Sequence, residues 1–242
     1  GSIYSNYKPF EVPSNQNLDF YFKIYNKIVE VFYPEVILGA NTTIKGDINS
    51  NNNLFKLNIK SPKIDVYNTN IDEINLQIDN KNPLFNTQLT VDKITSNYYN
   101  ISKFHLVNVT LNDTLYFRSE FKGGINNTED YNLSFYHTFN KEKKSVFGIQ
   151  SSNFTFKNNN WEINPLNNSK NKIVFDNAKK TYDFDTFLIS SKDQKIEFSG
   201  VVYDTVSKDL NFKFTNVKLE NITPKIDSLN LQGLINGSIN YN

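Results

Sequence analysis

The sequence contains no cysteine among its 242 residues and only two histidines. Disulfide bonds, thiolate chemistry and cysteine-ligated zinc are therefore excluded as features of this chain. It also lacks any run of about 18 apolar residues, the length that a membrane-spanning helix needs. Neither sign of charge dominates, because 26 basic residues stand against 25 acidic ones and the lysines are not gathered into a stripe. Nucleic acid is therefore not an expected partner.

Methionine is absent as well, even at position 1, and the chain opens with Gly1-Ser2, which resembles the scar of a cleaved tag. We therefore expect an excised fragment of a longer protein. Any export signal or membrane anchor is expected to lie outside these residues.

Aromatic residues are abundant, with 20 Phe and 14 Tyr. Aromatic and β-branched residues suit the pleated surface of a sheet. Along most of the chain, apolar residues also alternate with Lys, Asp and Asn, which places the apolar ones on one face of successive strands. We predict an all-β fold of about a dozen strands with almost no helix.

The stretch from Leu57 to Thr110 repeats one apolar pattern after thirty positions. The two copies are Ile64, Ile71, Ile74, Leu76 and then Ile94, Ile101, Phe104, Leu106. A unit of this kind cannot bury its own apolar face, and it normally stacks with its neighbours to form a continuous lining. We predict that the lining faces a groove. The predicted lining residues are Ile44, Ile48, Leu57, Ile59, Ile64, Val66, Ile74, Leu76, Ile78, Leu89, Val91, Phe104, Leu106, Leu133, Phe135, Phe198, Val202, Phe212, Phe214, Leu231, Ile235 and Ile239.

Three segments are expected. Residues 1–16 carry two prolines and predict an irregular lead-in. Residues 17–33 predict an amphipathic helix, because apolar residues recur at every fourth position and Pro34 can end it. This helix either covers the core or forms a plug over one end of the groove, through Phe20, Ile24, Ile28 and Phe32. Residues 34–242 predict a single β-domain.

Four glycines occupy positions in the strand alternation where an inward apolar side chain is expected: Gly46, Gly200, Gly233 and Gly237. Glycine within a strand marks a bend, a bulge or a close backbone approach, and glycine kinks curve a sheet. These positions favour a sheet bent into a trough. An ordinary β-sandwich with local bulges is the alternative.

Residues that carry catalysis are scarce. His137 lies on the apolar parity of its strand and predicts a hydrogen-bonded core histidine, and His105 also lies within a strand. Asp183 and Asp185 share one side of a strand, where they could bridge a cation or simply face solvent. No phosphate-binding glycine loop, nucleophile elbow or EF-hand loop is found. We predict that the protein is not an enzyme and has neither a catalytic residue, a cofactor nor a metal site.

Three stretches together resemble the TamB family of the AsmA-like superfamily, in particular the C-terminal part of its members. They are VKLENITPKIDSLNLQGLINGSINYN, YPEVILGANTTIKGDI and LNIKSPKIDVYNTNIDEINLQI. The resemblance covers nearly all of residues 18–242 and rests on the order of helix, repeats and terminal LxGxIxGxIxY. The family has no catalytic residues to carry over.

The resemblance implies a β-taco, which is a long antiparallel sheet curled into a U-shaped groove with an apolar interior. A second implication is a periplasmic protein that is anchored in the inner membrane and reaches the outer membrane of a diderm bacterium. It also implies movement of phospholipid along the groove and an Omp85-type outer-membrane partner. Two other functions stay open. One is a scaffold for outer-membrane protein assembly, with exposed sheet edges that pair with a client. The other is a surface adhesion or glycan-binding domain, with outward tyrosines such as Tyr116, Tyr136 and Tyr203 as platforms.

Overall fold

The computed structural model describes residues 13–25, 28–97, 99–124, 126–203, 207–223 and 231–242. Within these ranges the chain forms 17 β-strands and two short helices. Every strand pair with a defined register is antiparallel. The all-β class and the long antiparallel sheet are thereby confirmed, whereas the curling into a U stays a prediction. The chain divides into two compact units, residues 1–130 and 131–242, which differs from the single domain predicted over 34–242.

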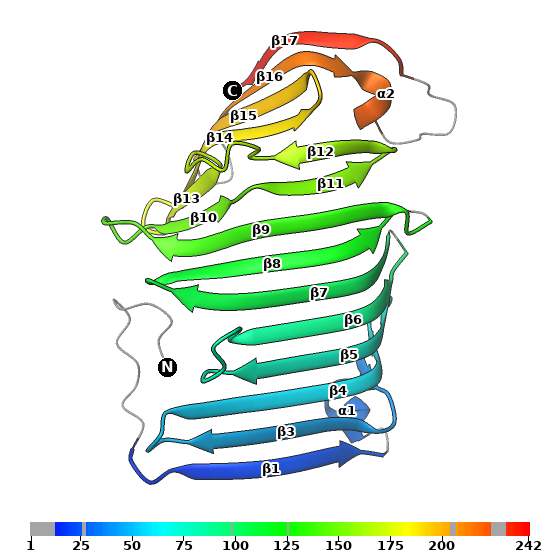
Figure 1. Ribbon diagram of the computed structural model, residues 1–242, viewed down its shortest axis with the longest axis vertical. Helices are drawn as coiled ribbons and strands as arrows, with labels where there is room; N and C mark the ends of the chain where they lie inside the picture. The colour runs from blue at the N-terminus through cyan, green and yellow to red at the C-terminus, as the bar shows by residue number, and fades with distance from the viewer. Residues whose placement is uncertain (1–12, 26–27, 98, 125, 204–206, 224–230) are drawn as a thin grey trace. The chain divides into compact units, whose positions relative to one another are not determined.

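The N-terminal unit (residues 1–130) is built from neighbouring antiparallel strands. They pair in the order β1, β3, β4, β5, β6, β7, β8, and β2 pairs with the last residues of β4. Figure 1 shows them from β1 in blue to β8 in green. The elements are β1 (Asn17–Ile24), α1 (Ile28–Phe32), β2 (Val36–Leu38), β3 (Thr42–Asn49), β4 (Leu54–Val66), β5 (Thr69–Asp79), β6 (Thr87–Thr95), β7 (Asn100–Leu111) and β8 (Thr114–Gly123).

The helix predicted over 17–33 is wrong for most of its length. Residues Asn17–Ile24 form β1, which pairs along its whole length with β3, and among the described residues of this range only Ile28–Phe32 is helical. The physical reason is that apolar residues four apart satisfy period 2 as well as period 3.6. Phe20 and Ile24 therefore lie in a strand, with Ile28 and Phe32 in the five-residue helix α1, so these four residues do not form the predicted plug helix.

Gly46 has a local function that differs from the predicted bending of the sheet. It lies opposite Phe20 on the neighbouring strand β1. A Cβ added at Gly46 would come within 2.3 Å of the Phe20 ring. The missing side chain therefore makes room for an aromatic ring from the next strand.

The C-terminal unit (residues 131–242) begins within β9, whose first two residues precede the boundary. Its last strands pair in the order β14, β15, β16, β17. The elements are β9 (Glu129–Phe139), β10 (Ser145–Ile149), β11 (Ser152–Phe156), β12 (Asn159–Ile163), β13 (Lys172–Asp176), β14 (Thr181–Ser191), β15 (Gln194–Tyr203), β16 (Ser207–Lys218), α2 (Leu219–Ile222) and β17 (Leu234–Tyr241).

Two long strands of this unit, β9 and β14, each pair with two short strands instead of with one long strand. β9 pairs with β11 near its start and with β10 near its end, while β14 pairs with β13 near its start and with β12 near its end. The loop between β12 and β13 is held by buried asparagines. The amide of Asn164 donates to the carbonyl of Ile149 over 2.7 Å, and the side-chain oxygen of Asn171 accepts from the backbone N–H of Leu188 over 2.8 Å. These bonds satisfy the backbone where the strands break.

The other three predicted bending glycines have positive φ angles of 131° to 144°. Gly200 lies opposite Phe184, where β14 shifts its register against β15. Gly237 lies opposite Phe214, beside a second shift between β16 and β17. Gly233 precedes β17. Two of the four glycines thus accompany irregularities of the sheet.

Candidate apolar binding face

One face of the N-terminal unit carries an unbroken row of aliphatic side chains across five strands. Directly paired residues point to the same side of a sheet. We call this row the aliphatic ladder, and it consists of Ile44, Ile59, Leu76, Leu89 and Leu106, each opposite the next. With roughly 4.8 Å between strands, its four steps span about 19 Å. Ile48, Leu57, Ile74, Ile78, Val91 and Phe104 lie on the same face by alternation, as predicted.

The side chains of this face are only half-buried. All five ladder residues keep part of their surface accessible, and Val91 alone among the predicted lining residues of this unit is fully buried, with 5% exposed. A packed core would bury such residues almost completely. The face is therefore an apolar surface that further apolar atoms can cover.

The opposite face of the same strands is polar. The Lys56 ammonium lies 3.2 Å from the Asp79 carboxylate, across the paired strands β4 and β5. Gln88 and His105 approach within 3.1 Å through their side-chain nitrogens on β6 and β7. The unit thus has one apolar and one hydrophilic side.

A line of outward residues crosses four strands of the unit. We call it the corner, and its residues are Pro62, Glu73, Asp92 and Lys103, which occupy corresponding positions in the registers of β4 to β7. All four are exposed. Glu73 and Lys103 have φ angles of 50° and 53°, a region that costs a non-glycine residue roughly 1–2 kcal/mol. Such residues interrupt the extended backbone, so we interpret this line as a bend.

Sequence reasoning missed the corner, although a signal for it exists. At four places, two consecutive polar or proline residues stand between two inward-facing residues. A regular strand has a single outward-facing residue there. The segments are 61–64 (SPKI), 71–74 (IDEI), 91–94 (VDKI) and 101–104 (ISKF). This spacing also explains why Ile64 and Val66 are half-buried although they have the opposite parity from Ile59.

Buried hydroxyl groups hold the corner where β2 and β3 meet β4. Thr42 and Ser61 are 1% and 3% exposed, and their side-chain oxygens lie 2.7 Å apart. Thr42 Oγ1 also lies 2.7 Å from the carbonyl oxygen of Gly39, and Ser61 Oγ lies 2.8 Å from that of Lys63, so two hydroxyl hydrogens are shared among three contacts. Because these groups satisfy one another, the backbone can break at this point without leaving buried polar atoms unpaired.

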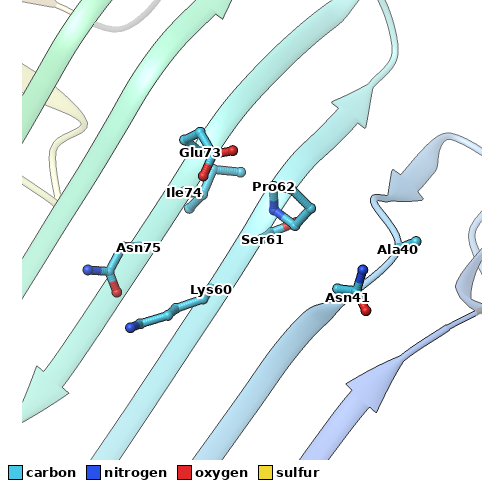
Figure 2. Close-up of a pocket in the computed structure, with 8 residues that line it drawn as sticks. All are labelled: Ala40, Asn41, Lys60, Ser61, Pro62, Glu73, Ile74 and Asn75. Atoms are coloured by element: carbon cyan, nitrogen blue, oxygen red, sulfur yellow. The ribbon is translucent and has the colours of Figure 1, made fainter.

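A pocket of about 390 Å³ lies at the corner. Figure 2 shows its lining, three consecutive residues from each of two paired strands together with two residues between β2 and β3. They are Lys60, Ser61 and Pro62 from β4, Glu73, Ile74 and Asn75 from β5, and Ala40 and Asn41. Lys60 and Asn75 lie opposite each other and alternate with Ile59 and Leu76, so their side chains project from the polar face of the sheet.

The C-terminal unit also has an apolar face, but aromatic rings dominate it. The ring of Phe198 lies 5.0 Å from that of Phe184 and 4.7 Å from that of Phe212, measured between centroids. The register places the predicted residues Leu133, Phe135, Phe198, Val202, Phe212, Phe214, Ile235 and Ile239 on this face. The predicted lining residue Leu231 is outside the strands.

His137 lies on this aromatic face. Its Nε2 is 2.7 Å from Ser145 Oγ, in agreement with the predicted hydrogen-bonded histidine, and its ring packs edge-on to Phe139. Burial lowers the pKa of His137 below its ordinary value. The folded unit therefore favours the neutral imidazole.

Acidification is expected to destabilise the C-terminal unit through His137. Because its pKa is lower in the folded chain, the unfolded chain binds more protons as pH falls through about 6.5, and stability is lost there. His137→Gln should reduce the loss of unfolding free energy between pH 7.5 and pH 5, measured by urea denaturation. His105→Gln serves as the control and should keep the full loss. Equal pH dependence in the two variants would contradict this assignment.

The aspartates Asp183 and Asp185, for which a bridged cation and a solvated strand face were the two interpretations, both lie on β14. Asp185 lies 3.5 Å from the ammonium of Lys172, and Asp183 is exposed in the adjoining part of β14. Among the described residues, no group of three or more His, Asp or Glu side chains is placed to hold a metal ion. Within the same ranges, no helix is long and apolar enough to cross a bilayer.

Of the three outward tyrosines, Tyr136 covers Gly148 on its own sheet, where an added Cβ would lie 2.3 Å from its ring. Tyr203 is 49% exposed and Tyr116 half-buried.

Comparison with known proteins identifies no relative. No protein-family model, curated protein or solved structure matches this chain. Functional conclusions therefore depend on the residues themselves.

Proposed function

We propose that this chain binds the acyl chains of phospholipids on its apolar face, as a segment of a periplasmic lipid conduit between the inner and outer membranes. The observation that carries the proposal is the half-buried aliphatic ladder, in which five strands contribute an aliphatic residue to one row. A surface of this kind in water requires an apolar cover.

The dimensions of the ladder fit an acyl chain. Its length of about 19 Å exceeds the roughly 15 Å that one leaflet of a bilayer provides for its hydrocarbon tails. Each methylene that leaves water contributes about 0.8 kcal/mol, so eight buried methylenes would contribute roughly 6 kcal/mol. Because the rungs are chemically alike, neighbouring positions along the row differ little in energy, which suits movement of the chain along it.

The proposal is tested on the purified protein. Mass spectrometry of an organic extract should detect phospholipid in a reproducible molar ratio after the protein has been expressed in a diderm host and purified without detergent. A neutral fluorescent hydrocarbon, diphenylhexatriene, should bind to the delipidated protein. A lipid-free protein that also fails to bind the hydrocarbon would overturn the proposal. The Omp85-type partner, the TamB-family membership and the periplasmic location stay predictions from the resemblance.

A further inference from the structure

The C-terminal unit contains two equivalent glycines, Gly200 on β15 and Gly237 on β17. Each lies directly opposite a phenylalanine of the preceding strand, Phe184 and Phe214 respectively, and each lies beside a shift in register. Their φ angles are also alike, at 136° and 144°. The arrangement of β14 with β15 is thus repeated by β16 with β17.

The two glycines differ in what lies beside them on the following side. At Gly200, an added Cβ would lie 2.1 Å from the backbone oxygen of Asp209, because the next strand, β16, passes close to it. At Gly237, no atom of the described residues lies within 4 Å of an added Cβ. Within the described ranges β17 pairs only with β16 (Figure 1), so its other edge is open. The equivalence of the two glycines indicates that the backbone of a further strand fits beside Gly237.

The open edge of β17 lacks the features that usually prevent a sheet edge from pairing. Its eight residues, LINGSINY, include no proline and no charged residue. The side chains of Leu234, Ile239 and Tyr241 are all more than half exposed. Natural proteins protect edge strands with lysine, proline, bulges or a covering element. We therefore expect β17 to receive a partner strand.

The strand β1 is an open edge of the same length, since among the described residues it pairs only with β3. Its apolar residues alternate in the same way as those of β17. Leu18 and Phe22 lie on the apolar face, yet they are 53% and 58% exposed. The charges of Asp19 and Lys23 cancel, and no other residue of β1 is charged. This edge therefore offers apolar side chains and no net charge to a neighbouring strand.

The backbone groups at the two edges are complementary. The carbonyl of Ile24 accepts from the N–H of Asn41, so the apolar residues of β1 direct their hydrogen-bonding groups toward β3. The carbonyl of Gly233, just before β17, accepts from the N–H of Leu219, so the apolar residues of β17 direct theirs toward β16. Each open edge therefore presents the N–H and C=O groups of its outward-facing residues. Antiparallel pairing joins these groups while keeping both apolar faces on the same side of the sheet.

We propose that the open edge of β17 pairs with β1 of a second copy of this chain, in an antiparallel register that places Phe22 opposite Gly237. Phe20 already covers Gly46 on the neighbouring strand β3, because an added Cβ there would lie 2.3 Å from its ring. Phe22 is therefore the exposed ring that can extend over the space beside Gly237.

This register pairs nearly all of both strands. It sets Leu18–Ile24 against Ile235–Tyr241, and no like charges meet because β17 has none. Since the two edges differ, the contact is heterologous, and a pair of copies keeps one open edge of each kind for further copies. The proposal does not depend on lipid binding, and its test uses no lipid.

The absence of cysteine from the chain allows a direct test with two single variants, Tyr21→Cys and Ser238→Cys. These positions are directly opposite in the proposed register, where Cα atoms lie about 4.5–5.5 Å apart, within the range of a disulfide. Under mild oxidation, an equal mixture of the two full-length variants should form a mixed disulfide, identified by mass spectrometry of the linked peptides. Tyr21→Cys mixed with Leu234→Cys is the register control and should form little, because four residues of strand separate the two positions by roughly 13 Å.

Sedimentation of the unmodified chain should show a mass that rises with protein concentration. Ile239→Lys should remove this rise, because it places a charge on the inward side of the edge strand. Leu166→Lys is the matched control and should keep the rise, since Leu166 is also exposed but lies in a loop outside both edges. Either a monomeric mass at every concentration or the absence of the mixed disulfide would overturn the proposal. A disulfide between two Ser238→Cys chains in preference to the mixed one would overturn β1 as the partner strand.

Discussion

Leu76→Asp is expected to abolish binding of phospholipid and of diphenylhexatriene by this protein. Leu76 occupies the middle of the aliphatic ladder, between Ile59 and Leu89, so a carboxylate there would meet apolar atoms from both neighbouring strands. A bound acyl chain would have to cover that charge, and burying an unpaired carboxylate costs far more than the hydrocarbon contributes. The expected loss of affinity is at least about 100-fold, measured by fluorescence titration and by mass spectrometry of co-purified lipid.

The control for this variant is its neighbour in sequence. Gln77→Asp adds the same charge to the other face of β5, where Gln77 pairs with Asn58 and Gln88. It should therefore leave lipid binding unchanged. Circular dichroism and a urea titration on both variants separate loss of binding from loss of folding, because Leu76 is only half-buried and the charge can remain solvated when no lipid is present. Normal lipid content in a folded Leu76→Asp variant would refute the apolar face as the binding surface.

Gly200→Ala is expected to be among the most destabilising single substitutions in the C-terminal unit. Gly200 has a φ of 136°, and an added Cβ would lie 2.1 Å from the backbone oxygen of Asp209 on the paired strand. Backbone atoms held in a sheet cannot yield as a flexible side chain can. The pairing of β15 with β16 would have to open locally, which we expect to cost at least about 3 kcal/mol in the free energy of unfolding.

Gly237 provides the matched control, because its φ of 144° is similar but no atom lies within 4 Å of an added Cβ. Gly237→Ala should therefore suffer only the backbone strain, about 1 kcal/mol. Urea unfolding followed by circular dichroism measures both, with the shift in midpoint as the primary value. Similar midpoints for the two variants would mean that the close approach at Gly200 relaxes without consequence.

The aliphatic ladder could be predicted from the sequence alone because alternation is a local property. A strand places every second residue on one face whatever its partners are. The alternation of apolar and polar residues therefore identified one apolar face, with Leu57, Ile59, Leu76 and Leu89, before any strand pairing was known. The same alternation placed the histidine at position 137 among apolar residues and predicted its hydrogen bond.

Tertiary structure decided the features for which local pattern is ambiguous. Apolar residues at every fourth position in 17–24 suit either a helix or a strand, and pairing with the edge of β3 selected the strand. The corner and its pocket depend on residues from β4, β5 and the break between β2 and β3, and only the register brings Lys60 beside Asn75. The parity of each strand was thus determined by the sequence itself. The alignment of strands was decided by cross-strand hydrogen bonds and packing, which join residues far apart in the chain and leave little trace in any single segment.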